Sequence, residues 1–292
     1  MKLNEGLGTT FINDVWENYA SERLASTGTY NSYVKMVNNF YKLTGASPVT
    51  CSVAAAKSYF NQIKNTTSIN TQYTRLAAFK SLRQYAIDKG IVFEPRNIFA
   101  FVELDDKPIE YTGNDLPCID ELHGLLNNVK GNVRDELLFN LILKCALTTG
   151  EIIRLRRTDF CLSLEEEPIL HISGSGAGRN LLLPIDVVEI AGRYFNEYNK
   201  ATNSVFINKR GGVLTERTLQ RIVLDRVSKC VSANILYKPY TADRLRTAGI
   251  ACMLAGGATN DETCKLAGIK PYWLFRLNHT VEVYRASEKS IL

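Results

Sequence analysis

Basic side chains along stretches predicted to be helical are the residues of this sequence whose type and spacing most directly suggest chemistry. Near residues 29–42 and 68–89, lysines and arginines lie between tyrosines. These basic residues are Lys35, Lys42, Arg75, Lys80 and Arg83. Helices that carry such cations can lie along a groove of duplex DNA and contact its phosphates. A solvated helix face is the simpler interpretation of any one of them, so the prediction of DNA contact depends on the whole set.

A second group of cations lies in the C-terminal half and gives the same indication. Its members are Arg179, Lys209, Arg210, Arg217 and Arg221. In the whole chain, 35 lysines and arginines outnumber 30 aspartates and glutamates, for a formal net charge of +5. That excess permits nucleic-acid binding without proving it. Two basic surfaces on separate domains would form a clamp around a duplex.

Other chemistries find little support in the sequence. A nucleotide-binding loop needs a helix after its glycines, whereas the GSGAGR segment at 174–179 precedes a predicted strand that ends at Pro184. The three histidines lack metal-ligand spacing, and none of the seven cysteines forms a Cys-x-x-Cys pair. We therefore predict no metal and no cofactor, and we interpret the cysteines as reduced thiols of a cytoplasmic protein. The chain has no apolar run of about 18 residues, and its N-terminus lacks an apolar signal core, so we expect neither a membrane span nor secretion.

The elements that must position these residues form two groups. Apolar spacing predicts helices at 10–24, from Thr29 onward, at 52–63 and at 68–89, which we assign to a helical domain of residues 1–101. The polar stretch 102–117, with two prolines, predicts a linker with few packing contacts.

The remaining residues, 118–292, are predicted to form a second domain of helices with a small β-sheet. Apolar runs on both sides of 174–179 predict a β-hairpin, and 204–208 predicts a further strand before a basic helix. Helices are also expected at 120–127, 135–147, 186–199, 242–255 and 261–267. The fold class expected is therefore mainly α with a small β-sheet.

Five blocks of the second domain, in order, carry a resemblance to a known family. They are LLFNLILKCALTTGEIIRLRRTDF, GSGAGRNLLLPI, SVFINKRGGVLTERTLQRIV, DRLRTAGIACMLAGGA and TVEVYRA. Together they resemble the tyrosine recombinase (phage integrase) family, and the N-terminal half is similar to that family's helical core-binding domain. The resemblance implies a core-binding domain followed by an α+β catalytic domain.

The resemblance also implies a reaction. In this family a tyrosine attacks a phosphodiester, two arginines hold the phosphate oxygens, and a lysine or histidine protonates the leaving group, without a metal. Arg246 matches an arginine of that set, and Tyr284 is the candidate nucleophile. The other expected positions are replaced by Thr148, Ser175, Asp243 and Ile269.

Two alternatives stay open at these positions. Tyr284 lies several residues farther from Gly268 than the family pattern predicts, so it is either the nucleophile or a packed aromatic residue of the last helix. Arg246 either holds a phosphate or pairs with Asp243.

We therefore expect a protein that binds double-stranded DNA and serves DNA integration or site-specific recombination, with strand cleavage weak or lost. The alternatives are an active recombinase with Tyr284 as nucleophile and a DNA-binding regulator without catalysis. The expected partners are duplex DNA and other recombinase-family subunits or further copies of this chain.

Overall fold

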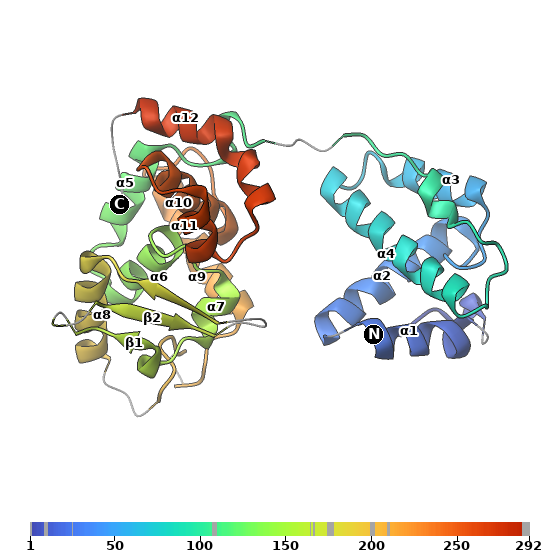
Figure 1. Ribbon diagram of the computed structural model, residues 1–292, viewed down its shortest axis with the longest axis horizontal. Coiled ribbons are helices and arrows are strands. Elements are labelled where there is room, and N and C mark those ends of the chain that lie inside the picture. Colours follow the sequence, from blue (N-terminus) through green and yellow to red (C-terminus); the bar gives the residue numbers. More distant parts are fainter. Residues whose placement is uncertain are drawn as a thin grey trace. The chain divides into compact units, whose positions relative to one another are not determined.

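The chain folds into two compact units, Met1–Pro108 and Ile109–Leu292, each with its own hydrophobic core (Figure 1). The computed structural model describes residues 2–8, 11–24, 26–106, 110–163, 165, 167–173, 178–198, 202–208 and 211–287. The boundary between the units falls inside the stretch that the sequence predicts to be a linker.

The first unit is helical, as expected. Its elements are η1 (Glu5–Leu7), η2 (Phe11–Trp16), α1 (Glu17–Arg23), α2 (Thr27–Thr44), α3 (Val53–Ile63), α4 (Ile69–Asp88) and η3 (Ile98–Phe101). Helices α2, α3 and α4 each begin after a serine, Ser26, Ser52 or Ser68, whose hydroxyl accepts a hydrogen bond from a backbone N–H of the first turn. The ring of Phe40 lies among other aromatic rings in the core, including that of Phe79 at 5.0 Å.

The second unit combines helices with one small sheet. Its helical elements are η4 (Gly113–Asp115), α5 (Ile119–Val129), α6 (Val133–Leu143), α7 (Thr149–Arg154), η5 (Arg157–Asp159), α8 (Ile185–Glu197), α9 (Glu216–Ser232), α10 (Ala242–Ala255), α11 (Asn260–Ala267), η6 (Pro271–Leu277) and α12 (Asn278–Ala286). Strands β1 (Phe160–Cys161), β2 (Ile169–Ile172) and β3 (Arg179–Leu182) form an antiparallel sheet in that order. The predicted hairpin and fold class are confirmed.

One predicted strand is wrong. Residues 204–208 make only single bridges, Arg156 with Ser204 and Ile207 with Val213, and they form no named strand among the described residues. The apolar side chains that suggested a strand, Val205 and Phe206, are buried in the core all the same. Burial and not sheet pairing explains the apolar run.

About half of the described residues of the predicted linker are exposed, but those near each end of the stretch include side chains that pack against a unit. Val102 is buried in the core of the first unit, and Asp105 forms an exposed ion pair with Lys64. Leu116 is buried in the second unit, and the backbone N–H of Tyr111 donates to the Arg276 carbonyl at 2.9 Å. The polar composition hid the few apolar side chains that bind each end of the stretch to its own unit. None of the described helices is long and apolar enough to cross a membrane.

Helices α6 and α10 approach closely at a glycine. A Cβ atom at Gly249 would lie 2.1 Å from the backbone oxygen of Leu143, at the C-terminal end of α6. Figure 1 shows α10 in the interior of the second unit, next to α6. Because α10 carries Arg246 and α6 leads into the turn before α7, this contact sets the distance between two parts of the candidate site.

We predict that Gly249→Ala destabilises the protein by about 3 kcal/mol, because overpacking against backbone cannot relax by a rotamer change. Gly192→Ala on α8 is the matched control, since no atom lies within 4 Å of its added Cβ. It should stabilise by about 0.5–1 kcal/mol through helix propensity. Urea unfolding of both variants measures the difference, and equal stabilities would contradict the proposed close contact.

Candidate functional site

Helix α7 starts at a reciprocal cap where the family pattern would have an arginine. The Thr148 hydroxyl accepts from the backbone N–H of Glu151 at 3.1 Å, while the Glu151 carboxylate accepts from the Thr148 N–H at 2.8 Å. This capping box satisfies N–H groups that the first turn leaves free. Thr148 therefore has a clear local role as a helix cap.

Arg246 is held by carbonyls from two helix ends. Its Nε donates to the Ala146 oxygen and its Nη2 to the Ala267 oxygen, both at 2.6 Å. Ala146 has a positive φ of 50° in the turn after α6, and Gly268 ends α11 in the left-handed region. Such helix ends leave backbone oxygens without helical partners.

Burial lowers the pKa of Arg246, an effect that the nearby charges of Glu151 and Asp243 oppose. The side chain is only 8% exposed, but it lies on the wall of a pocket. Its two carbonyl contacts fix the direction of the guanidinium, which is the requirement for binding a phosphate in a defined place.

A second arginine reaches the same region from the hairpin. The Arg179 Nη1 lies 2.5 Å from the Glu151 Oε1, and its Nε donates to the Leu266 oxygen at 2.9 Å. Arg179 and Arg246 thus bind consecutive carbonyls at the end of α11. Burial opposes ionisation of Glu151, but the hydrogen bonds from Arg179 and Thr148 outweigh it and hold the pKa of this carboxyl below its usual value.

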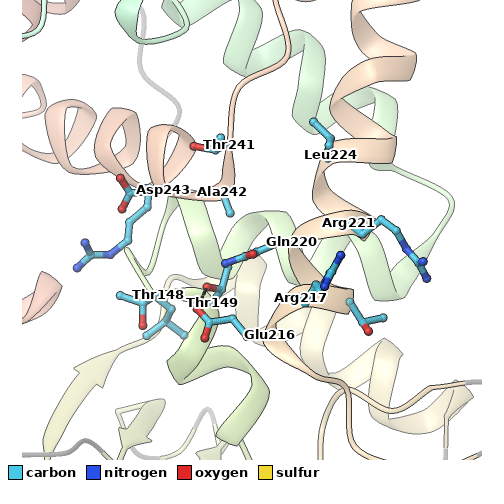
Figure 2. A pocket seen from close by; sticks show the side chains of 13 residues that line it. Thr148, Thr149, Glu216, Arg217, Gln220, Arg221, Leu224, Thr241, Ala242 and Asp243 are labelled. Atoms are coloured by element: carbon cyan, nitrogen blue, oxygen red, sulfur yellow. Dashed lines mark hydrogen bonds between the residues drawn. The ribbon is translucent and has the colours of Figure 1, made fainter. Parts of the chain in front are cut away.

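A pocket of about 870 Å³ lies where α7, α9 and α10 meet. Figure 2 shows Thr241 and Asp243 on one side, Arg217 and Arg221 on the other, and the threonines 148 and 149 at the start of α7 below. The Thr149 hydroxyl donates to Glu216 at 2.7 Å and so joins α7 to α9. The charged residues that line this pocket are three arginines and two carboxylates, which leaves a local excess of positive charge suited to an anion. They are Arg217, Arg221, Arg246, Glu216 and Asp243.

Tyr284 lies away from this pocket. Its side chain is 3% exposed on α12, and its hydroxyl donates to the Pro117 carbonyl. Burial, reinforced by nearby groups such as Cys252, raises the pKa of its phenol far above the usual range. A nucleophilic tyrosine needs an accessible oxygen with a base or cation to activate it. In this conformation Tyr284 has the arrangement of a packed aromatic residue.

The positions at which the sequence predicts replaced catalytic residues have different surroundings. Asp243 is exposed in the first turn of α10, and no ion pair among the described residues joins it to Arg246. The alternative in which Arg246 only pairs with Asp243 is therefore not what the structure contains. Ile269 is half-buried against the core of the second unit. Ser175, like the cations at 209 and 210, lies outside the described residues.

The basic residues that the sequence places on a DNA-binding surface of the first unit differ in exposure. Arg83 is 4% exposed, with its Nη1 donating to the Val49 oxygen at 2.6 Å, and burial lowers its pKa. Arg75 is half-buried and donates to the Tyr59 hydroxyl at 2.7 Å. Lys80 is half-buried as well, whereas Lys35 and Lys42 are exposed on α2. Arg83 is thus an internal structural residue, because its charge is used to bind backbone oxygens.

The ion pair of Glu151 was not predicted from the sequence, although its capping role has a local sequence signal. Thr148 and Glu151 have the Thr-x-x-Glu spacing of a capping box, as do Thr259 and Glu262 at the start of α11. The ion pair with Arg179 joins residues 28 positions apart, and no local pattern predicts it. Among the described residues, no cluster of His, Cys, Asp or Glu could hold a metal ion.

Comparison with solved structures identifies the fold. An integrase of transposon Tn1549 in complex with transposon right-end DNA matches with a TM-score of 0.72 and 14% identity, over 94% of this chain and 97% of that one. A lambda integrase dimer bound to a core site matches with a TM-score of 0.69 and 14% identity, over 93% of each chain. The XerH recombinase bound to a palindromic substrate matches with a TM-score of 0.66 and 18% identity, over 94% of this chain and 81% of that one.

The chain therefore has the fold of tyrosine recombinases and integrases over nearly its full length. Neither a protein-family model nor a curated protein matches the sequence. The identities to the solved structures are low, so these matches establish the fold and leave the activity to be inferred from the site.

We predict that Glu151→Gln lowers the free energy of unfolding by about 2–3 kcal/mol at neutral pH, because the substitution removes a charge-assisted hydrogen bond. The folded pKa of Glu151 is depressed, so its contribution is present above the ordinary value of 4.5 and is lost as pH falls through the folded pKa. The difference between the two proteins in urea unfolding should therefore shrink as the medium is acidified.

Glu262→Gln is the control for that comparison. It alters the same kind of capping box on α11, but its carboxylate is exposed and its capping partner is Thr259. Glu262→Gln should lower the free energy of unfolding by less than Glu151→Gln does at neutral pH. A pH-independent difference between wild type and Glu151→Gln would show that the ion pair with Arg179 does not contribute to stability.

Proposed function

We propose that this protein binds double-stranded DNA and serves DNA integration or site-specific recombination, with strand cleavage weak or lost. The observation that carries the proposal is the pocket around Arg246, in which a fixed guanidinium and two exposed arginines remain in the fold of tyrosine recombinases. The cytoplasmic location inferred from the sequence is part of the same proposal.

Support for DNA binding comes from the cations of the second unit. Arg217 and Arg221 are four residues apart on α9, so they lie on one helix face, and both are exposed. A phosphate at this pocket would be contacted by the exposed cations of α9 and by the fixed Arg246. Solved structures of the same fold include integrases bound to DNA, and one of them is a dimer on its site.

Support for weak or lost cleavage comes from the groups that surround the pocket. Among the described residues that line it, there is no lysine, histidine or tyrosine to act as general acid or nucleophile. Asp243 would repel a phosphate, and Thr148 is neutral. Removing one preorganised charge contact costs a factor of about 10²–10³ in rate, so several such replacements leave little activity.

We predict that the chain binds labelled mixed-sequence duplex DNA with an affinity that falls steeply as salt rises, because phosphate contacts release counterions. The double variant Arg217→Ala/Arg221→Ala should bind at least roughly tenfold more weakly, with a salt slope smaller by about two. Fluorescence anisotropy titrations at several salt concentrations measure both quantities.

Lys265→Ala provides the control, because this lysine is exposed on α11 and does not line the pocket. It should leave the affinity and the salt slope nearly unchanged. The absence of wild-type binding even at low salt would refute the proposed function. An equal effect of Lys265→Ala and of the α9 variant would refute the assignment of the contacts to α9.

We also predict that the wild-type protein forms no covalent adduct with DNA. Duplexes would first be selected from a random library by binding, and nicked versions of them would then serve as suicide substrates. Denaturing gels would detect a phosphotyrosine-linked complex. An adduct formed by the wild type and absent from Tyr284→Phe would establish the alternative, an active recombinase with Tyr284 as nucleophile.

If binding is seen without an adduct, Arg246→Lys tests the phosphate pocket. Lysine keeps the charge but loses the planar fork that binds two carbonyls and an anion together. Affinity should fall roughly tenfold, in keeping with the loss of one charge-assisted contact. Unchanged affinity in a folded variant would mean that Arg246 serves only to join α6, α10 and α11.

A further inference from the structure

The segment 110–117, at the start of the second unit, is hydrogen-bonded to η6 and α12. The Tyr111 N–H donates to the Arg276 carbonyl at 2.9 Å, and the Thr280 hydroxyl donates to the Tyr111 carbonyl at 3.4 Å. Farther along, the Pro117 carbonyl accepts from the Tyr284 hydroxyl. The backbone of this segment is therefore tied to η6 and α12, which leaves the ring of Tyr111 in a fixed position.

That ring lies against a cation in the first turn of α10. The guanidinium carbon of Arg244 lies 4.6 Å from the centroid of the Tyr111 ring. Arg244 Nη1 is buried and has no hydrogen-bond partner among the described residues. A cation near a helix N-terminus is also disfavoured by the helix dipole. The aromatic face compensates this cation where no hydrogen bond does.

The first turn of α10 forms one wall of the pocket. Thr241 caps the helix by accepting from the Arg244 N–H at 3.3 Å, and Thr241, Asp243 and Arg246 all line the pocket. Arg244 itself does not line it. Loss of the ring would leave the buried Nη1 of the half-buried Arg244 without a compensating group in the turn that presents these residues, and the turn would loosen to expose this atom to water.

We propose that Tyr111 is a positioning residue for the pocket: it holds Arg244, and through Arg244 the first turn of α10. Tyr111 lies three residues after Pro108, the last residue of the first unit. The ring therefore connects the start of the second unit to the first turn of α10, which lines the pocket. This inference rests on the proposed function for its effect on DNA, but its structural step can be tested without DNA.

The experiment compares Tyr111→Leu, which removes the ring, with Tyr111→Phe, which keeps it, in the full chain. Hydrogen exchange of the Arg244 and Leu245 amides reports on the first turn of α10, because both donate to Thr241. Exchange should become faster in the Leu variant and stay unchanged in the Phe variant. Tyr237→Leu, at an exposed tyrosine outside the pocket, is the matched control and should leave exchange unchanged.

Binding of the labelled mixed-sequence duplex gives the second readout. Tyr111→Leu should weaken it roughly threefold to tenfold, while Tyr111→Phe binds as the wild type does. In an Arg217→Ala background the loss caused by Tyr111→Leu should shrink, because both changes act on one pocket. A loss of equal size in both backgrounds would overturn the positioning role.

The two proposals fail in different ways. If the wild type binds no duplex, the proposed function is lost, and the exchange comparison still decides whether Tyr111 holds the turn. If exchange at Arg244 and Leu245 is the same in the wild type and in the Phe and Leu variants, the inference is overturned even when DNA binding is intact.

Discussion

The second unit is organised around the need to bind the buried guanidinium of Arg246. A cation 8% exposed needs acceptors in fixed positions, and the two it has are backbone oxygens, of Ala146 and Ala267. These oxygens are free because α6 and α11 end where they do, and Gly249 lets α10 approach α6 closely enough to reach the first of them. The arginine therefore joins three helices in addition to facing the pocket.

The shape of this site is held by contacts within the protein that need no bound phosphate. Thr148 starts α7 with a hydroxyl cap, which needs no positive charge, and Glu151 of the same turn pairs with Arg179 of the hairpin. Each of these contacts joins two groups of the protein itself and does not require a bound phosphate. The walls of the pocket can thus persist whether or not a nucleophile and a general acid accompany them, and this is the physical basis for proposing binding without efficient cleavage.

The sequence predicted those parts of the fold that depend on local patterns. Helices with serine caps, such as Ser52 and Ser68, and the hairpin around 174–179 follow from residue spacing alone. The packing of residues 110–117 could not be predicted, because it depends on Tyr111 meeting residues more than a hundred positions later. The ion pair of Glu151 with Arg179 could not be predicted for the same reason, because its partners are far apart in the sequence. The family resemblance drew attention to Arg246 and to the positions predicted to be replaced, but it could not supply the partners of these side chains.

Arg83 and Arg246 show why charge in a sequence does not by itself locate a binding surface. Both are buried, both donate to pairs of backbone oxygens, and burial lowers the pKa of each. The difference is that Arg246 lines an open pocket together with Arg217, whereas Arg83 does not line that pocket. A guanidinium whose position is already fixed loses little further freedom when it binds an anion, so it gives directional binding. An anion site therefore requires a fixed arginine together with accessible space, a combination that depends on the three-dimensional structure and that a count of charges does not locate.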